Sequence, residues 1–184
     1  MKTDSRSRLL QAAEKVTYRR GYGNAALAEI AEEARIPLGN VYYYFKTKDE
    51  IAEAIVERRV SRFRKQLEEL DRAGSPQESL CGFVQIKIDN RLGLARGGCP
   101  VGTLCSELRK AGGAAAKNVT ILFETALDWM EQKFRAIGKG TESRAFAVHL
   151  LAATQGASVL AHTFHDPRLI DVESARLKEW IRSL

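Results

Sequence analysis

Two groups of side chains in this sequence have types and spacings suited to binding or reaction chemistry. The first group lies in the N-terminal quarter and consists of amides, phenols and cations around a turn: Asn24, Arg35, Pro37, Leu38, Asn40, Tyr42, Tyr43, Lys46 and Lys48. Such groups hydrogen-bond to base edges and to phosphate oxygens, and an apolar side chain can contact a thymine methyl. The second group is a pair of thiols, Cys99 and Cys105, six residues apart.

Two short helices must position the first group. Leu27, Ile30, Ala31 and Ala34 recur at helical spacing, so the sequence predicts one helix there. The segment 35–37 interrupts it, because the residue before a proline avoids the helical region while proline itself suits the start of a new helix. We expect the second helix to span about residues 37–45, with Val41 and Phe45 facing inward. The polar side chains of this helix therefore face solvent or a partner.

The run IAEEARIPLGNVYYYFKTKDEI resembles the helix-turn-helix of the TetR family of bacterial transcriptional regulators, most specifically in GNVYYYFKTKDEI. The resemblance covers about residues 6–56. It implies an all-α protein whose second short helix enters the major groove of double-stranded DNA. By this resemblance Tyr42 contacts phosphate and Tyr43 faces the DNA. Lys48, at the start of the next helix, would hold a phosphate together with the free N–H groups of that helix.

The sequence departs from the family pattern at two places. Where the family carries hydroxyl side chains, this chain has Asn24-Ala25-Ala26; we expect Asn24 to cap the following helix, and the hydroxyl contacts to phosphate are missing. Where the family often has glycine, a small polar residue and a basic residue, this chain has Arg35, Pro37 and Leu38. Arg35 is either a phosphate or base contact or a solvated arginine, and the sequence leaves both open.

Charge and composition agree with an anionic partner. The chain of 184 residues has a net charge of +6, and the nine basic and five acidic residues up to Lys48 give +4 of it. The N-terminus is charged rather than apolar like a signal peptide, and no apolar run approaches 18 residues, so we expect no membrane partner. Three cysteines without a secretory signal indicate a reducing cytoplasm, and neither a zinc pattern nor a cofactor motif is present.

Helical patterns continue through the rest of the chain. They predict helices over about 48–70, 76–94, 118–137 and 141–165, a short helix after Gly98, and a last amphipathic helix around Trp180. We expect residues 1–48 to bind DNA, 48–70 to connect, and 71–184 to bind an effector and dimerise. Small residues between Ala152 and Ser158 suggest close helix packing. The family implies that this packing joins two chains in a homodimer, whereas the sequence alone also permits packing within one chain.

By the same resemblance, the C-terminal part holds a pocket for an unknown small-molecule effector. Such pockets are largely apolar with a few polar groups. The candidates are Phe83, Ile86, Leu104, Leu108, Phe123, Leu127 and His149. Taken singly, each of them is better explained as ordinary core. They include no cluster of cations, which favours a neutral, moderately hydrophobic ligand over an anionic one.

Three hypotheses of function follow. The preferred one is a repressor, with activation left open, that an effector releases from a near-palindromic operator. A second hypothesis is a thiol sensor of the same fold: GGCPVGTLCSELRK resembles a Gly-Cys-Pro segment of one family subset, and the start of a helix favours thiolate at Cys99. The alternative for Cys99 and Cys105 is that both are small buried residues. The third hypothesis is a helical interaction module or an enzyme without DNA binding, although no catalytic motif is present.

Overall fold

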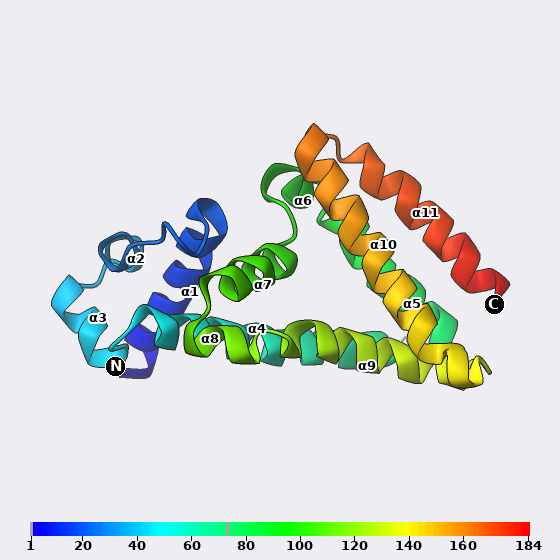
Figure 1. Cartoon of the computed structure of the whole chain (residues 1–184), viewed down its shortest axis with the longest axis horizontal. Coiled ribbons are helices and arrows are strands. Elements are labelled where there is room, and N and C mark those ends of the chain that lie inside the picture. The colour runs from blue at the N-terminus through cyan, green and yellow to red at the C-terminus, as the bar shows by residue number, and fades with distance from the viewer. Residues whose placement is uncertain (1, 73) are drawn as a thin grey trace. The chain divides into compact units, whose positions relative to one another are not determined.

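The computed structural model describes residues 2–72 and 74–184. Within these ranges the chain is helical and contains no β-strand, which confirms the predicted all-α class (Figure 1). The helices of the N-terminal part are α1 (Lys2–Arg20), α2 (Leu27–Ala34), α3 (Leu38–Tyr44) and α4 (Lys48–Asp71). They are followed by α5 (Pro76–Asp89), α6 (Arg91–Gly97), α7 (Pro100–Ala111), α8 (Gly113–Asn118), α9 (Ile121–Ala136), the 3₁₀ turn η1 (Gly140–Glu142), α10 (Ser143–Phe164) and α11 (Arg168–Ser183).

Two of the predicted helices differ from those observed. The helix expected over 76–94 is divided at Asn90 into α5 and α6, because the Asn90 amide donates to the Ile86 carbonyl and so competes with the helical pattern. The helix expected from residue 118 begins at Ile121, and a separate short helix, α8, precedes it. Gly112 and Gly113, both with positive φ, separate α8 from α7. Such backbone angles are open to glycine at little cost.

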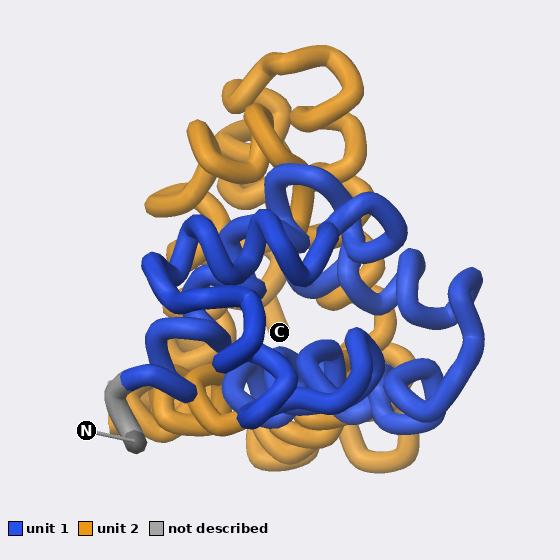
Figure 2. Tube along the Cα trace, turned by 90° about the vertical axis from the view of Figure 1, so that its left-hand side faces the viewer, with its two compact units in different colours: residues 1–60, 100–122 blue, residues 61–99, 123–184 orange. Residues whose placement is uncertain are grey.

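The chain divides into two compact units, which Figure 2 shows in different colours. Unit 1 comprises residues 1–60 and 100–122, and unit 2 comprises residues 61–99 and 123–184. Helix α4 belongs to unit 1 as far as Val60 and to unit 2 beyond it. This is a division by packing. The division by function, with boundaries at residues 48 and 70, stays a prediction.

The core of unit 1 is made by the apolar faces of its helices. Helix α1 packs against α2 and α7, and α2 packs against α3. Leu9, Val16, Ile30 and Ile55 are almost completely buried there. Gly21 ends α1 with a φ of +80°, the left-handed conformation that helix C-termini favour.

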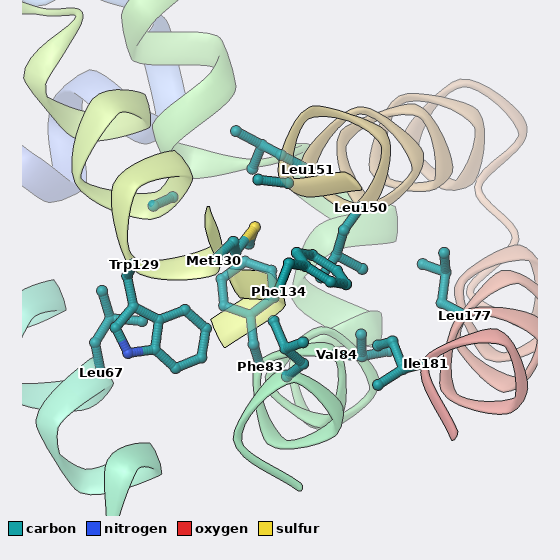
Figure 3. Close-up of a cluster of buried hydrophobic side chains, with 13 residues drawn as sticks. Leu67, Phe83, Val84, Trp129, Met130, Phe134, Leu150, Leu151, Leu177 and Ile181 are labelled. Atoms are coloured by element: carbon teal, nitrogen blue, oxygen red, sulfur yellow. The ribbon is translucent and has the colours of Figure 1, made fainter. Parts of the chain in front are cut away.

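The core of unit 2 is a cluster centred on aromatic side chains (Figure 3). It joins α5, α9, α10 and α11 with the part of α4 that belongs to this unit. Phe134 is fully buried, and its ring lies 5.5 Å from Phe146 and 5.7 Å from Trp180. Phe83 contacts Trp129 in the same cluster, with ring centroids 6.2 Å apart.

One segment of the described chain, Gly140–Phe164, meets the length and composition of a membrane-crossing helix, with a mean hydropathy of 1.2. The expectation that no stretch reaches this length and apolar character therefore does not hold for α10. A third of the tested window, 33%, is buried inside the protein. Core helices of soluble proteins pass the same test, and the buried side of α10 packs on α6 and α11.

Candidate DNA-binding surface

Two buried side chains anchor the short helix α3. Val41 is completely buried and Phe45, the residue that ends the helix, is 3% exposed. The φ of Pro37 is −54°, which suits the position just before the helix, and Phe45 returns to extended backbone with a φ of −140°. The predicted inward orientation of Val41 and Phe45 is confirmed. Because these two residues lie four apart, they fix which side of α3 faces outward.

The outward side of α3 carries most of the predicted binding residues. Tyr43 is 65% exposed, Tyr42 49% and Leu38 42%. Asn40 is exposed three residues before Tyr43, so both occupy neighbouring positions on the helix surface. Pro37 and Lys46, on either side of the helix, are exposed as well. The structure thus presents polar aromatic, amide and cationic groups to solvent beside one another.

Two reciprocal hydrogen bonds cap the N-terminus of α4. The Glu50 N–H donates to Thr47 Oγ1 at 3.1 Å, and the Lys46 N–H donates to Glu50 Oε2 at 2.7 Å. This arrangement resembles a capping box, whose sequence signal is Thr-x-x-Glu before an apolar run. The signal is present at Thr47–Glu50, but the sequence analysis missed it. The capped terminus holds Lys48 at the first turn, where backbone N–H groups remain available to an anion.

Lys48 lies against the corner between α1 and α2. Its Nζ donates to the Gly23 carbonyl at 2.9 Å and lies 4.7 Å from the centre of the Tyr22 ring. Partial burial lowers the pKa of Lys48, and the nearby negative charge of Glu107 works in the opposite direction. The ammonium group is therefore held in place before any ligand arrives.

The corner itself is tied to the segment formed by α7 and α8, which belongs to the same unit. The Tyr22 hydroxyl donates to Asp49 Oδ1 at 2.8 Å, and the Tyr22 N–H donates to Glu107 Oε2. The other Asp49 oxygen accepts from the Ala114 N–H at 3.3 Å. Burial is the largest cause that raises the pKa of Tyr22, followed by the hydrogen bond to Asp49. No sequence signal revealed these partners, because Glu107 and Ala114 lie far along the chain from Tyr22 and Asp49.

Asn24 and Arg35 occupy positions that the sequence did not fully predict. The Asn24 amide donates to the Arg20 carbonyl at 3.3 Å, whereas the residue before α2 is Ala26, which makes no side-chain cap. The prediction that Asn24 caps α2 is therefore wrong; its amide caps the preceding helix instead. Arg35 is exposed and ends α2 in the left-handed conformation, with φ 55° and ψ 49°.

The seven predicted effector residues are divided between the two units. Leu104 and Leu108 are buried in unit 1, and the other five belong to unit 2. Phe83 is part of the unit 2 core, and Phe123 and Leu127 pack against it. Ile86 is half-buried, and the exposed His149 meets the Trp180 ring edge-on at 4.9 Å. Most of these residues thus have the contacts of ordinary core, so their role in binding stays a prediction.

Two hollows in the described structure differ greatly in size. The first, in unit 1 beside Leu104, has a volume of about 10 Å³, the space of a single water. The second is an open groove of about 320 Å³ in unit 2, within the range of small-ligand sites. Its lining residues are Arg64, Leu67, Glu68, Asp71, Thr125, Asp128, Trp129 and Gln132. None of the seven predicted effector residues lines this groove.

Cys99 and Cys105 are both 7% exposed. Cys99 immediately precedes α7, as expected, and the Cys105 thiol faces the Val119 carbonyl at 3.6 Å. Neither forms a disulfide within the described residues, and burial of this kind is typical of unreactive cysteines. Within residues 2–72 and 74–184, no group of three or more His, Cys, Asp or Glu side chains could hold a metal ion.

Comparison with known proteins identifies the N-terminal part. Residues 9–55 match the pattern of bacterial regulatory proteins of the tetR family, which covers most of α1, all of α2 and α3, and the start of α4. This part of the chain is a DNA-binding domain of the TetR type. The chain is a helix-turn-helix transcriptional regulator, and the exposed side of α3 is the surface with which regulators of this kind bind DNA.

Relatives extend this likeness along the chain. An HTH-type transcriptional regulator in the lacX 3′ region of Lactococcus lactis is 27% identical over 95% of this chain and 92% of that protein. The HTH-type transcriptional repressor NemR of Escherichia coli K12 is 27% identical over 68% of each chain. The crystal structure of reduced E. coli NemR superposes with a TM-score of 0.84 at 21% identity, covering 96% of both chains. A TetR-family regulator from Agrobacterium tumefaciens gives 0.86 at 20% identity, covering 96% of this chain and 97% of that one. The structural matches share the fold of this chain.

Proposed function

We propose that this regulator is a cytoplasmic repressor of the TetR family that binds a near-palindromic operator as a homodimer and leaves it when a small molecule binds. The observation that carries the proposal is the exposed side of α3. An apolar-anchored helix that exposes three binding side chains, Asn40, Tyr42 and Tyr43, is suited to the major groove.

Within this surface the side chains divide into two roles. Asn40, Tyr43 and Arg35 would contact base edges, and Leu38 would meet a thymine methyl. Tyr42, Lys46 and Lys48 would hold phosphates, together with the N–H groups at the start of α4. Lys48 is already fixed against Tyr22 and Gly23, so it would lose little side-chain freedom when it binds.

The homodimer is supported by large apolar residues of α10 that stay exposed among the described residues. These are Val148, Val159, Leu160 and Phe164, and the small exposed residues Ala152 and Gly156 lie on the same helix. Val159 is 61% exposed and Phe164 68%. A second copy packed on these residues would bury them and place two α3 helices about 34 Å apart, one turn of DNA.

Release by an effector requires a ligand that binds the DNA-free state more tightly than the DNA-bound state. The C-terminal segment of α7 and α8 is joined to the Tyr22 corner by Glu107 and Asp49, which gives such a ligand a route to the head. The relative NemR is named a repressor, which supports repression here. We also place the chain in the subset with a Gly-Cys-Pro segment, Gly98–Pro100. Burial of both thiols favours the small-molecule effector over the thiol sensor.

A selection of genomic DNA fragments with the purified protein tests the proposal. The selection is repeated with Tyr43→Ala and at two salt concentrations. We expect a palindromic site that salt weakens, because phosphate contacts release counterions, and that Tyr43→Ala no longer selects. Tyr18→Ala, which removes a tyrosine from the surface of α1 instead, is the matched control and should retain the site.

Binding that is weak, independent of sequence and equal in wild type and Tyr43→Ala would contradict the proposal. It would favour instead a helical module that does not read DNA. A palindromic site occupied by a monomer would contradict only the homodimer.

A further inference from the structure

The turn between α2 and α3 contains a backbone conformation that is costly for its residue. Arg35 has a φ of 55°, and apart from His165 every other described residue with positive φ is a glycine. A side chain in this left-handed region crowds the following carbonyl, which is why helices usually end there on glycine. Some interaction must therefore hold Arg35 in this conformation, and with it the direction in which α3 leaves α2.

The backbone N–H groups of Arg35 and Ile36 bond to carbonyls of α2 at this helix end, and Arg8, on α1, adds a side-chain contact to the same turn. Its Nη2 donates to the Ala34 carbonyl at 2.7 Å and to the Arg35 carbonyl at 3.3 Å. If α2 continued as a helix, N–H groups four residues later would bond to these carbonyls. The turn at Ile36-Pro37 removes those donors, and the Arg8 guanidinium replaces them. A bond from a charged donor is stronger than one from a neutral donor.

We propose that Arg8 is a positioning residue for DNA reading: it holds the α2–α3 turn in the left-handed form and so aims α3 into the groove, without itself contacting DNA. This inference rests on the proposed function of α3. A cation that binds phosphate would contribute to DNA affinity whatever the conformation of Arg35. The contribution of Arg8 should instead depend on that conformation.

Arg6, two residues earlier on the same helix, provides a matched comparison. Its guanidinium lies 5.2 Å from the centre of the Phe45 ring, at the opposite end of α3. Replacing either arginine by alanine removes one positive charge from the first turns of α1. Only Arg8 contacts the turn that contains Arg35, so only its loss should depend on the residue at position 35.

The test is a double-mutant cycle with Arg8→Ala, Arg35→Gly and the double variant, using the operator found by the selection above. We expect Arg8→Ala to weaken operator binding about tenfold, as the loss of a charged hydrogen bond would. In the Arg35→Gly background the same change should cost less than about twofold, since glycine needs no support in this conformation. The contribution of the Arg35 side chain to DNA binding cancels in the cycle. The effect of Arg6→Ala should be the same in both backgrounds.

A second measurement needs no DNA. The Ile36 N–H donates to the Ala31 carbonyl at 2.9 Å across the turn. We expect Arg8→Ala to accelerate hydrogen exchange of this amide in the free protein, and Arg35→Gly to restore its protection. Arg6→Ala should leave it unchanged.

Two results would overturn the inference. One is an equal loss of affinity from Arg8→Ala in both backgrounds, with the slope of log affinity against log salt reduced by about one, which identifies a phosphate contact. The other is unchanged exchange at Ile36 in Arg8→Ala. If wild type binds no DNA specifically, the proposed function fails, and the exchange measurement still decides whether Arg8 holds the turn.

Discussion

Tyr22 connects three parts of unit 1 through one side chain and one backbone group. Its hydroxyl meets Asp49 at the start of α4, its N–H meets Glu107 on α7, and its ring lies beneath the Lys48 ammonium. Tyr22 is buried in the core of unit 1, and these polar contacts give it a role beyond packing.

We predict that Tyr22→Phe lowers the free energy of unfolding by about 1 kcal/mol at neutral pH, the usual net value of a hydrogen bond. Burial and Asp49 raise the pKa of Tyr22 in the folded state. In wild type, the unfolded tyrosine ionises from about pH 10 while the folded one stays protonated, so this stabilisation is present below pH 10 and is lost as pH rises above it. The difference in stability between wild type and variant should therefore narrow above pH 10.

Urea denaturation of both proteins between pH 7 and pH 11 measures this difference. The other tyrosines titrate in both proteins and cancel. A difference that is constant through pH 11 would show that the folded pKa of Tyr22 is not raised.

At the scale of elements, the helix ends predicted from the sequence agree most clearly with the structure. A helix was predicted to begin at about residue 76, and α5 begins at Pro76 with a complete capping box at Ser75. The Glu78 N–H donates to Ser75 Oγ at 3.2 Å, and the Ser75 N–H donates to Glu78 Oε2 at 2.8 Å. Thr47 and Glu50 form a related arrangement at α4, the helix that presents Lys48.

We predict that Ser75→Ala and Thr47→Ala each lower the free energy of unfolding by about 1 kcal/mol, the usual cost of losing a cap. Only Thr47→Ala should also weaken DNA binding, because it loosens the N–H groups that would hold a phosphate. Chemical denaturation and operator titration of the two variants separate the effects. Equal weakening of DNA binding by both would mean that stability alone controls it.

At the scale of the whole molecule, the exposed side of α10 is the proposed dimer interface. Isolated exposed apolar residues are common, but four large ones on one helix, Val148, Val159, Leu160 and Phe164, favour an interface. The length and composition of α10 also satisfy the criteria of a membrane helix. A helix that its own chain buries on one side and a second copy buries on the other would have the same apolar composition.

We predict that Val159→Glu converts the proposed homodimer into a monomer, because the new carboxylate would be buried without a partner. Sedimentation velocity measures the change, and operator affinity should fall with it since one chain holds only one half-site. Leu92→Glu is the control. Leu92 lies on α6 and is 61% exposed, as Val159 is, and its replacement should leave the dimer intact. A Val159→Glu dimer of unchanged affinity would exclude this side of α10 as the interface.

The sequence by itself determined the helix-turn-helix. The spacing of Leu27, Ile30, Val41 and Phe45 is a local property that decides which side of each helix is buried. Gly21 and Ser75-Pro76 marked helix ends for equally local reasons. The exposure of Tyr42 and Tyr43 followed from the same periodicity, because an α3 anchored at two positions four apart has only one outward side.

Only the tertiary structure decided what holds this head in place. Arg8 bonds to Ala34, Glu107 bonds to Tyr22, and Ala114 bonds to Asp49 across separations of 26, 85 and 65 residues. No local pattern encodes such pairs, since each depends on how several helices pack. The same reason explains why Asn24 caps α1 rather than α2, and why the predicted effector residues fall into two units. Local periodicity fixes the faces of helices, whereas the partners of polar side chains are fixed only when those faces come together.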